Sequence, residues 1–186
     1  MKWLSKRISV KKHGLFTTII ITPLQNFWVN LFMGAWLAMW ITIGAVVISS
    51  FFIFKLEYQE KSTLWIFLTF WVYYLQKISR SFIWLLYGKE LIKIDEVGLN
   101  YKRSIFKYGK THVVFFENIV SITSRFPEEK SLEAVWESSP WINGGERIFL
   151  ETKFKTYSLG RKLTKTEASG LMDLLKTSVK KAKLND

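Results

Sequence analysis

The segment Trp28–Phe54 contains no charged residue in 27 consecutive positions. A hydrocarbon core of about 30 Å is crossed by about 20 helical residues, so this segment is long enough to span a membrane with some tilt. Phe27 and Trp28 stand at its start, where membrane proteins carry a belt of aromatic side chains. The sequence therefore predicts a transmembrane helix at residues 28–54.

A second apolar segment follows after the short polar connection Lys55–Ser62. Residues 63–87 begin with the uncharged run TLWIFLTFWVYYL and then include Lys77 and Arg80. A cation near the bilayer centre costs roughly 2.5–3.5 kcal/mol, but these two lie past the midpoint, and long side chains can extend to the headgroups. We predict a second span at 63–87, so that residues 28–87 form a two-helix transmembrane hairpin.

The distribution of charge predicts the orientation of this hairpin. Residues 1–27 carry five Lys or Arg and no acid, residues 28–87 carry four against two Glu, and residues 88–186 carry eighteen against thirteen acids. Basic flanks are retained on the cytoplasmic side, so both termini are expected there. The net charge of +12 also suits nucleic acid, but no basic motif interleaved with aromatics supports that use, and no nucleic-acid partner is expected.

Two pairs of residues in the hairpin are candidate partner-binding positions. Gly34 and Ala38 are four apart and allow close helix contact, either with the second helix of the same chain or with another membrane protein or a second copy. Gln76 and Arg80 share a helix face by the same spacing. They either extend to lipid phosphates or form a polar seam against a partner subunit.

Residues 88–186 change to a period of two, which is typical of strands. Hairpin signals join the first strands and also the last two. Expected strands lie at Leu91–Ile94, Leu99–Phe106, Thr111–Phe116, Ile119–Ile122, Glu146–Glu151 and Lys155–Leu159, with a long loop at Arg125–Gly145. A further strand at about 15–22, in the basic N-terminal segment 1–27, is a candidate to join this sheet.

The last predicted element is an amphipathic helix at 165–182. Thr164 and Glu167 form a capping box, in which each side chain accepts a hydrogen bond from the backbone of the other residue. Apolar residues then recur at helical spacing. The fold class expected is a membrane α-helical hairpin plus a mainly antiparallel β domain capped by a C-terminal helix.

Several short motifs carry a family resemblance. They are LLYGKELIKID at the end of the hairpin, then GLNYKR, a loop with spaced Trp and Gly-Gly, and FLETKFKTYSLGRKLTKTEASGLMDLL. The entry TPLQNFWVNLFMGAWLAMW fits the same pattern. Together they resemble uncharacterised bacterial two-span membrane proteins with a pleckstrin-homology-like domain. The resemblance implies a bacterial inner-membrane location and that fold, and no activity. Where those relatives often have glycine in the last hairpin turn, this chain has Lys153-Phe154.

Candidate binding residues in the β domain fall in two groups. A basic hairpin gathers four cations that cytoplasmic anionic lipids attract at about 1 kcal/mol each, although strand alternation places Lys102 and Arg103 on opposite faces. The four are Lys102, Arg103, Lys107 and Lys110. The long loop carries Trp136 and Trp141, which either fold over the sheet edge or contact the bilayer or a partner protein.

The sequence predicts no catalytic, metal or cofactor site. His13 and His112 are the only histidines, cysteine is absent, and no nucleotide-binding or hydrolase motif occurs. The chain is therefore expected to be a non-catalytic, membrane-anchored interaction or scaffold module, or an accessory subunit of a membrane assembly. The alternative is a regulator that senses anionic lipid headgroups through the basic hairpin and the Trp-bearing loop.

Overall fold

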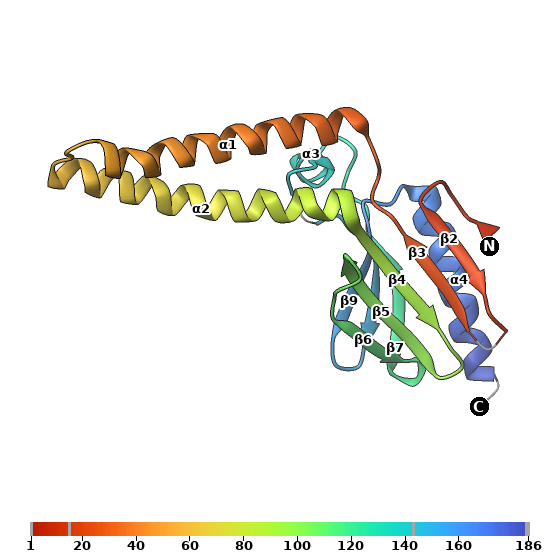
Figure 1. The fold of residues 1–186 in the computed structure, drawn as a ribbon. Coiled ribbons are helices and arrows are strands. Elements are labelled where there is room, and N and C mark those ends of the chain that lie inside the picture. The colour runs from red at the N-terminus through yellow and green to blue at the C-terminus, as the bar shows by residue number, and fades with distance from the viewer. Residues whose placement is uncertain (1, 15, 143, 185–186) are drawn as a thin grey trace. The chain divides into compact units, whose positions relative to one another are not determined.

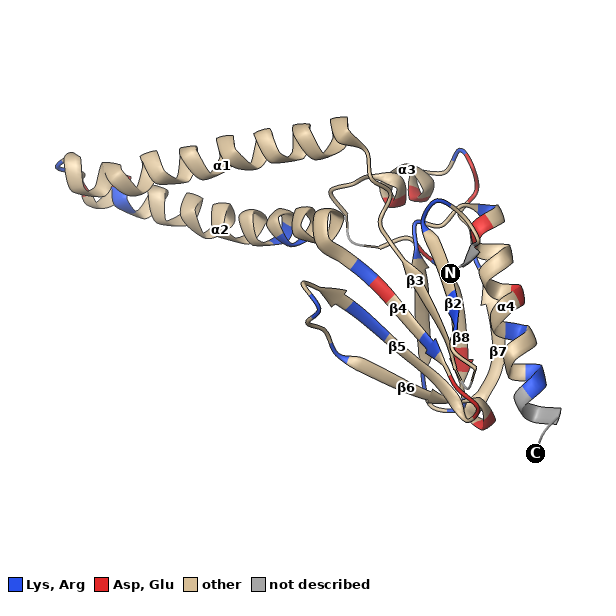
Figure 2. Cartoon of the chain, turned by 45° about the vertical axis from the view of Figure 1, so that its right-hand side comes forward, with Lys and Arg blue, Asp and Glu red and all other residues tan. Residues whose placement is uncertain are grey.

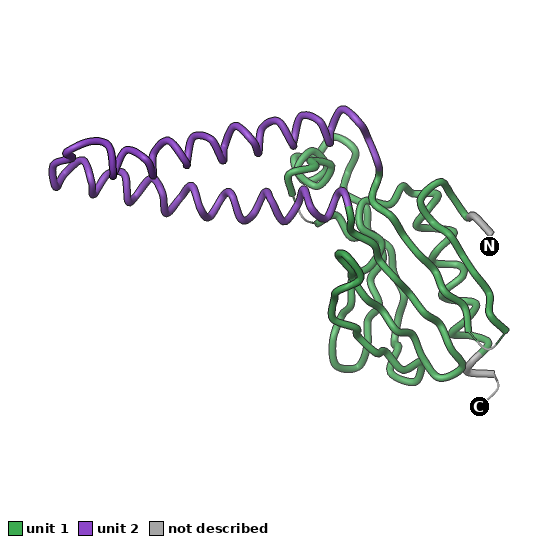
Figure 3. Tube along the Cα trace, in the orientation of Figure 1, with its two compact units in different colours: residues 1–24, 87–186 green, residues 25–86 purple. Residues whose placement is uncertain are grey.

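The computed structural model describes residues 2–14, 16–142 and 144–184. The chain divides into two compact units, one of residues 25–86 and one of residues 1–24 with 87–186 (Figure 3). The first unit is built from two helices. The second contains mainly antiparallel strands with two further helices (Figure 1).

The first helix, α1, covers Phe27–Ile53. Asn26 caps its start, because the Asn26 side-chain oxygen accepts hydrogen bonds from the backbone N–H of Trp28 at 3.0 Å and of Val29 at 3.4 Å. Among the described residues, α1 is the one helix that is long and apolar enough to cross a membrane. Its most apolar window is only 11% buried, which is unlike the core helix of a soluble protein.

The second helix, α2, covers Tyr58–Tyr87. It contains three Trp and four Tyr together with Lys77 and Arg80, and these lower its mean hydropathy below that of a typical span. Its outward side chains are nevertheless largely apolar or aromatic, such as Trp65, Ile66 and Phe70. The segment forms one continuous helix of 30 residues.

Reciprocal hydrogen bonds tie α1 to α2. The indole N–H of Trp71 donates to the carbonyl of Trp40 at 2.8 Å, and the indole N–H of Trp40 donates to the carbonyl of Trp71 at 3.3 Å. Gly44 makes this approach possible, because a Cβ there would lie 2.0 Å from the Trp71 ring. Trp71 and Gly44 are both buried, so this crossing is the tightest contact between the two helices.

The other unit contains two antiparallel sheets. The larger has the order β1-β2-β3-β4-β5-β6, and the smaller has the order β7-β8-β9. The strands are β1 Lys2–Trp3, β2 Ile8–Lys12, β3 Thr17–Ile21, β4 Gly88–Ile94, β5 Gly98–Ile105, β6 Thr111–Phe115, β7 Ile119–Ser124, β8 Glu146–Thr152 and β9 Thr156–Arg161. A 3-10 turn at Phe116–Asn118 leads from one sheet to the other.

The core lies between these sheets and under the C-terminal helix α4, Lys165–Leu184. Alternate residues of the strands point inward, and Ile19, Ile92 and Ile148 have no exposed surface. The predicted capping box of α4 is confirmed. Thr164 Oγ1 accepts from the Glu167 N–H at 3.3 Å, and Glu167 accepts from the Thr164 N–H at 3.0 Å.

The N-terminal segment contributes more structure than one strand. The expected strand at 15–22 contains β3, which pairs with β4 through Ile19–Ile92 and neighbouring positions; Leu15 lies outside the described residues. Strands β1 and β2 extend the same sheet beyond β3. Their short runs and the exposed Lys11 and Lys12 give little periodic signal.

The region 125–145 is not a continuous loop, because it contains the short helix α3, Leu132–Ser138. Ser131 caps it by accepting from the Ala134 N–H at 3.1 Å. Asn143 of the same region lies outside the described residues. Strand β8 ends at Thr152 and β9 begins at Thr156, so three residues lie between them. Neither Lys153 nor Phe154 has a positive φ.

Candidate functional site

One end of the larger sheet carries both chain connections to the helical unit. Strand β4 begins at Gly88, immediately after α2 ends, and β3 ends at Ile21, which pairs with Glu90. Gly88 in turn pairs with Ile105, the last residue of β5. The turn that follows β5 therefore lies beside the residue at which α2 enters the sheet.

This turn, Ile105–Tyr108, is here called the tip hairpin. The backbones of Ile105 and Tyr108 exchange two hydrogen bonds of 2.9 Å, which leaves Phe106 and Lys107 as the central residues of a two-residue turn. Both have positive φ, +48° and +73°, where Asn and Gly are the preferred residues. The backbone is therefore strained by about 1–2 kcal/mol per residue in order to place an aromatic and a cationic side chain here.

Exposed aromatic rings dominate the tip hairpin. Tyr108 is 84% exposed and Phe106 is 57% exposed. The Phe106 ring also contacts the ring of Tyr87, the last residue of α2, with centroids 4.3 Å apart. Aromatic rings next to lysines are the composition of a membrane–water interface. The pattern FKYGK signals this surface in the sequence, but the sequence reasoning considered only its lysines.

The four predicted basic residues do not form one cluster. Lys102 points outward, and its Nζ donates to the Lys107 carbonyl at 2.9 Å. Arg103 points inward, where its guanidinium donates to Glu146 at 2.8 Å and to the Ser158 carbonyl at 2.9 Å. This is the alternation expected of neighbouring strand residues. Lys107 belongs to the tip hairpin, and Lys110 is exposed just before β6. Figure 2 colours the Lys and Arg positions of the ribbon blue.

Behind the tip hairpin, a buried carboxylate joins the two sheets. Glu90 of β4 is 1% exposed. Its two oxygens accept hydrogen bonds from the backbone N–H of Gly160 at 2.8 Å and of Arg161 at 3.2 Å in β9. Gly160 has a φ of +72°, so β9 turns there in a way that directs both N–H groups at Glu90. The contact aligns β4 with β9.

Guanidinium groups surround a second carboxylate in the same region. Glu146 Oε1 accepts from Arg103 at 2.8 Å and from Arg161 at 3.3 Å. Burial alone would raise the pKa of Glu146, but the two arginines hold it below the ordinary value. Burial raises the pKa of the Tyr101 hydroxyl well above its usual range, and the hydroxyl oxygen accepts a hydrogen bond from Arg103 Nε.

A third ionic contact fastens the N-terminal segment to α4. Arg7 is buried and lies 3.6 Å from Glu167, and it also donates to the carbonyls of Thr22 and Lys162. Burial opposes ionisation of Glu167, yet hydrogen bonds from Thr164 and Ser5 and the charge of Arg7 lower its pKa.

These lowered pKa values predict a loss of stability in acid. A carboxyl whose folded pKa is depressed stabilises the fold above its unfolded pKa, and that contribution is lost as pH falls through the folded value. We expect the thermal midpoint of the domain to fall as the pH drops below about 4.5, the ordinary value for Glu. The Glu146→Gln/Glu167→Gln double variant should start lower at pH 7 and show a smaller fall. An equal fall in both proteins would contradict this assignment.

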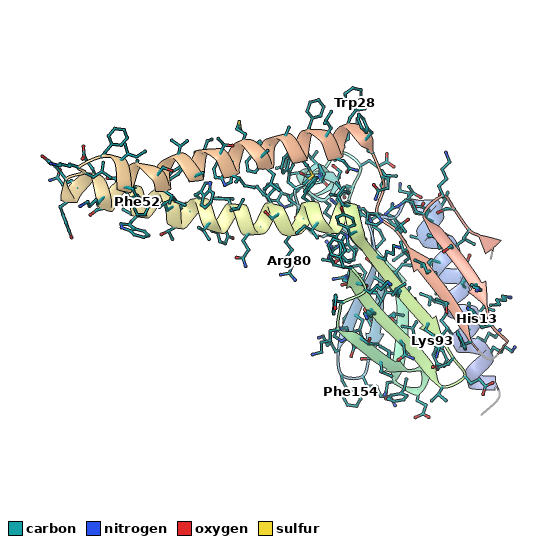
Figure 4. The ribbon with its side chains drawn as sticks, viewed as in Figure 1. His13, Trp28, Phe52, Arg80, Lys93 and Phe154 are labelled. Carbon is teal, nitrogen blue, oxygen red and sulfur yellow. The ribbon has the colours of Figure 1, made fainter. Side chains whose placement is uncertain are left out.

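The predicted positions in the hairpin face different ways. Gly34 faces α2, because a Cβ there would lie 3.3 Å from the Phe82 ring, whereas Ala38 is exposed. The two residues therefore do not make one contact stripe within this chain. Gln76 and Arg80 are both exposed on α2, and the Arg80 side chain points away from α1 (Figure 4).

The two predicted tryptophans also have different surroundings. Trp136 of α3 is 69% exposed, and Leu132 and Val135 beside it are exposed as well. Trp141 is half-buried. The structure therefore gives α3 an uncovered apolar face within this unit, and it does not bring Trp136 and Trp141 together into one exposed pair.

No group of three potential metal-ligating side chains occurs among the described residues. His13 stacks on Phe16, and His112 lies 5.8 Å from the Tyr157 ring. Comparison of the chain with protein-family models and with curated proteins gave no match.

Proposed function

We propose that this chain is a non-catalytic, membrane-anchored interaction module of the bacterial inner membrane. In this proposal α1 and α2 cross the bilayer as a two-span hairpin, both termini are cytoplasmic, and the β unit is a pleckstrin-homology-like domain. The tip hairpin contacts anionic lipid headgroups. The observation that carries the proposal is the exposed aromatic and basic turn beside Tyr87, where α2 ends and the domain begins.

Two features support a crossing by α2 as well as α1. The connection between them is only Phe54–Glu57, so the helices are antiparallel neighbours. Apart from Lys61 near its start, the cations of α2 lie in its C-terminal half, where a long cationic side chain can extend toward headgroups. Lys77 is directed back along the helix, with its Nζ 3.3 Å from the Tyr73 hydroxyl, so its side chain has to turn toward the C-terminal end of α2 to reach the cytoplasmic headgroups.

The order of strands supports the pleckstrin-homology-like assignment. Strands β3 to β6 form a consecutive antiparallel meander, β7 to β9 form a second one, and α4 follows the last strand and covers the core. The helical hairpin is inserted between β3 and β4. Residues 1–27 contain five cations and no acid, which supports the cytoplasmic placement of this unit.

Lipid contact by the tip hairpin is tested with a variant that removes its aromatic and cationic side chains and introduces residues that prefer the backbone conformation of the turn. The Phe106→Asn/Lys107→Gly/Tyr108→Ser variant places the preferred Asn-Gly pair in the turn and removes two aromatic rings and a cation. We expect the domain to remain at least as heat-stable, because strain at two residues is relieved. Enrichment of anionic lipid in polymer-extracted native particles, measured by mass spectrometry, should decrease.

A matched control exists in the turn between β8 and β9. Lys153 and Phe154 are also an exposed cation and aromatic ring, with Phe154 85% exposed. The Lys153→Gln/Phe154→Ser variant should keep the lipid enrichment of the natural chain. Equal enrichment in all three proteins would show that the tip hairpin does not select lipid.

The exposed face of α3 favours a second function, recruitment of a partner protein. Leu132, Val135 and Trp136 leave a hydrophobic surface on a short helix, and tryptophan is a frequent interface hot spot. A stoichiometric protein, or a second copy of this chain, that co-purifies with the natural protein and is lost in Leu132→Ser/Trp136→Ser would establish this role. Co-purification that survives the substitutions would exclude this face.

A further inference from the structure

A cavity of about 260 Å³ opens between the free edges of the two sheets. Strand β6 ends the larger sheet and β9 ends the smaller one, so neither has a neighbouring strand on this side. The cavity is lined by Tyr101, Arg103, Lys110, His112, Lys155, Thr156, Tyr157 and Ser158. Phe106, Lys107 and Tyr108 of the tip hairpin do not line it, so this site is distinct from the proposed lipid-contact turn.

The lining is basic and contains no carboxylate. Three cationic side chains, Arg103, Lys110 and Lys155, are among the eight that line it. Lys155 lies over the Tyr157 ring at 5.6 Å from its centroid. Like charges that converge on a cavity repel one another, so the arrangement is most favourable when an anion occupies the space between them.

The acids behind the cavity do not neutralise this charge. Glu146 is shared between Arg103 and Arg161, and Glu90 directs both oxygens to the backbone N–H groups of Gly160 and Arg161. Glu146 thus pairs with two guanidinium groups, Glu90 accepts from backbone N–H groups, and within the described part of the chain neither Lys110 nor Lys155 forms an ion pair. A ligand carrying close to two negative charges would balance them.

We propose that this cavity binds a phosphate monoester. Its dianionic oxygens match the donors that line the site, which are one guanidinium, two ammonium groups and the hydroxyls of Thr156 and Tyr157. The rings of His112 and Tyr157, 5.8 Å apart, form a wall for the organic part of the ligand. The monoester comes from one of two sources, a lipid headgroup or a soluble metabolite.

The test uses the full-length chain in nanodiscs of zwitterionic lipid, at about 0.15 M salt so that non-specific attraction is screened. Glycerol 3-phosphate is titrated as the soluble monoester, with calorimetric detection. Phosphatidic acid in the nanodisc is the lipid monoester, and its binding is read from the rise in the thermal midpoint of the domain relative to phosphatidylglycerol, a diester.

The variant Lys110→Gln/Lys155→Gln removes two exposed cations that line the cavity, and Lys130→Gln/Lys153→Gln removes two exposed cations that line neither the cavity nor the tip hairpin. We expect the first variant to weaken binding of one monoester by roughly tenfold or more, with little change in the second. Response to glycerol 3-phosphate would identify a soluble ligand, and response to phosphatidic acid alone would identify a headgroup. No binding of either monoester, or equal weakening in both variants, would overturn the proposal.

Discussion

Substitution of Glu90 by alanine is expected to destabilise the β domain by about 3 kcal/mol, which lowers its thermal midpoint by about 10 °C. The side chain is 1% exposed and accepts the backbone N–H groups of Gly160 and Arg161. Its removal leaves two buried donors without an acceptor and leaves the nearby guanidinium of Arg103 with less opposing charge. The measurement is thermal unfolding of the full-length chain in nanodiscs, with protease susceptibility of the domain as the readout of unfolding.

Two further variants separate the hydrogen bonds from the charge. Glu90→Gln keeps one acceptor oxygen in place and should fall between the natural chain and Glu90→Ala. Glu96→Ala removes an acid from an exposed turn and should change the free energy of unfolding by less than about 0.5 kcal/mol. A Glu90→Ala protein as stable as Glu96→Ala would show that the link between β4 and β9 does not stabilise the fold.

Substitution of Gly44 by leucine is expected to separate the two helices at their tightest crossing. Any Cβ at this position would lie 2.0 Å from the Trp71 ring. Overpacking costs about 1–3 kcal/mol, and each of the two Trp40–Trp71 hydrogen bonds that is lost adds about 0.6 kcal/mol in a membrane. We expect the hairpin to unfold at a clearly lower fraction of SDS in mixed micelles, followed by far-UV circular dichroism.

The neighbouring residue provides the control for this substitution. Ala45 is exposed, so Ala45→Leu adds a similar side chain to the outer surface of α1 and should leave the SDS midpoint unchanged. The exposed Ala38 should behave in the same way if it faces lipid, whereas a loss of oligomer in Ala38→Leu would identify it as a partner contact. Equal midpoints for Gly44→Leu and Ala45→Leu would contradict the packing described here.

Local signals in the sequence were sufficient for the elements that depend on neighbouring residues. The uncharged run at 28–54 corresponds to α1 at Phe27–Ile53 because exclusion of charge and helical length are read along one segment. The capping box at Thr164 and Glu167 likewise depends on four consecutive residues. The opposite directions of Lys102 and Arg103 follow from strand alternation alone.

Features that join distant segments could not be predicted in this way. Glu90 reads as one charge in an alternating strand, and only the fold brings the Gly160 N–H to it across 70 positions. The cavity likewise combines residues near 103, 112 and 155. The residues of β2 show only a weak alternation of apolar and polar side chains, and the strand is stabilised by its pairing with β3. The lysine of the tip hairpin could be identified from the sequence, whereas the exposure of Phe106 and Tyr108 depends on the two positive φ angles of the turn.

The central claim is that α1 and α2 both cross the membrane and leave the β domain on the cytoplasmic side. The chain has no cysteine, so single cysteines can be introduced at Gln59, in the first turn of α2, and at Phe154, in the exposed turn of the domain. Labelling with a membrane-impermeant maleimide is then compared in right-side-out vesicles before and after permeabilisation. The account predicts that Gln59→Cys is labelled at once and Phe154→Cys only after permeabilisation; labelling of both from the same side would contradict it.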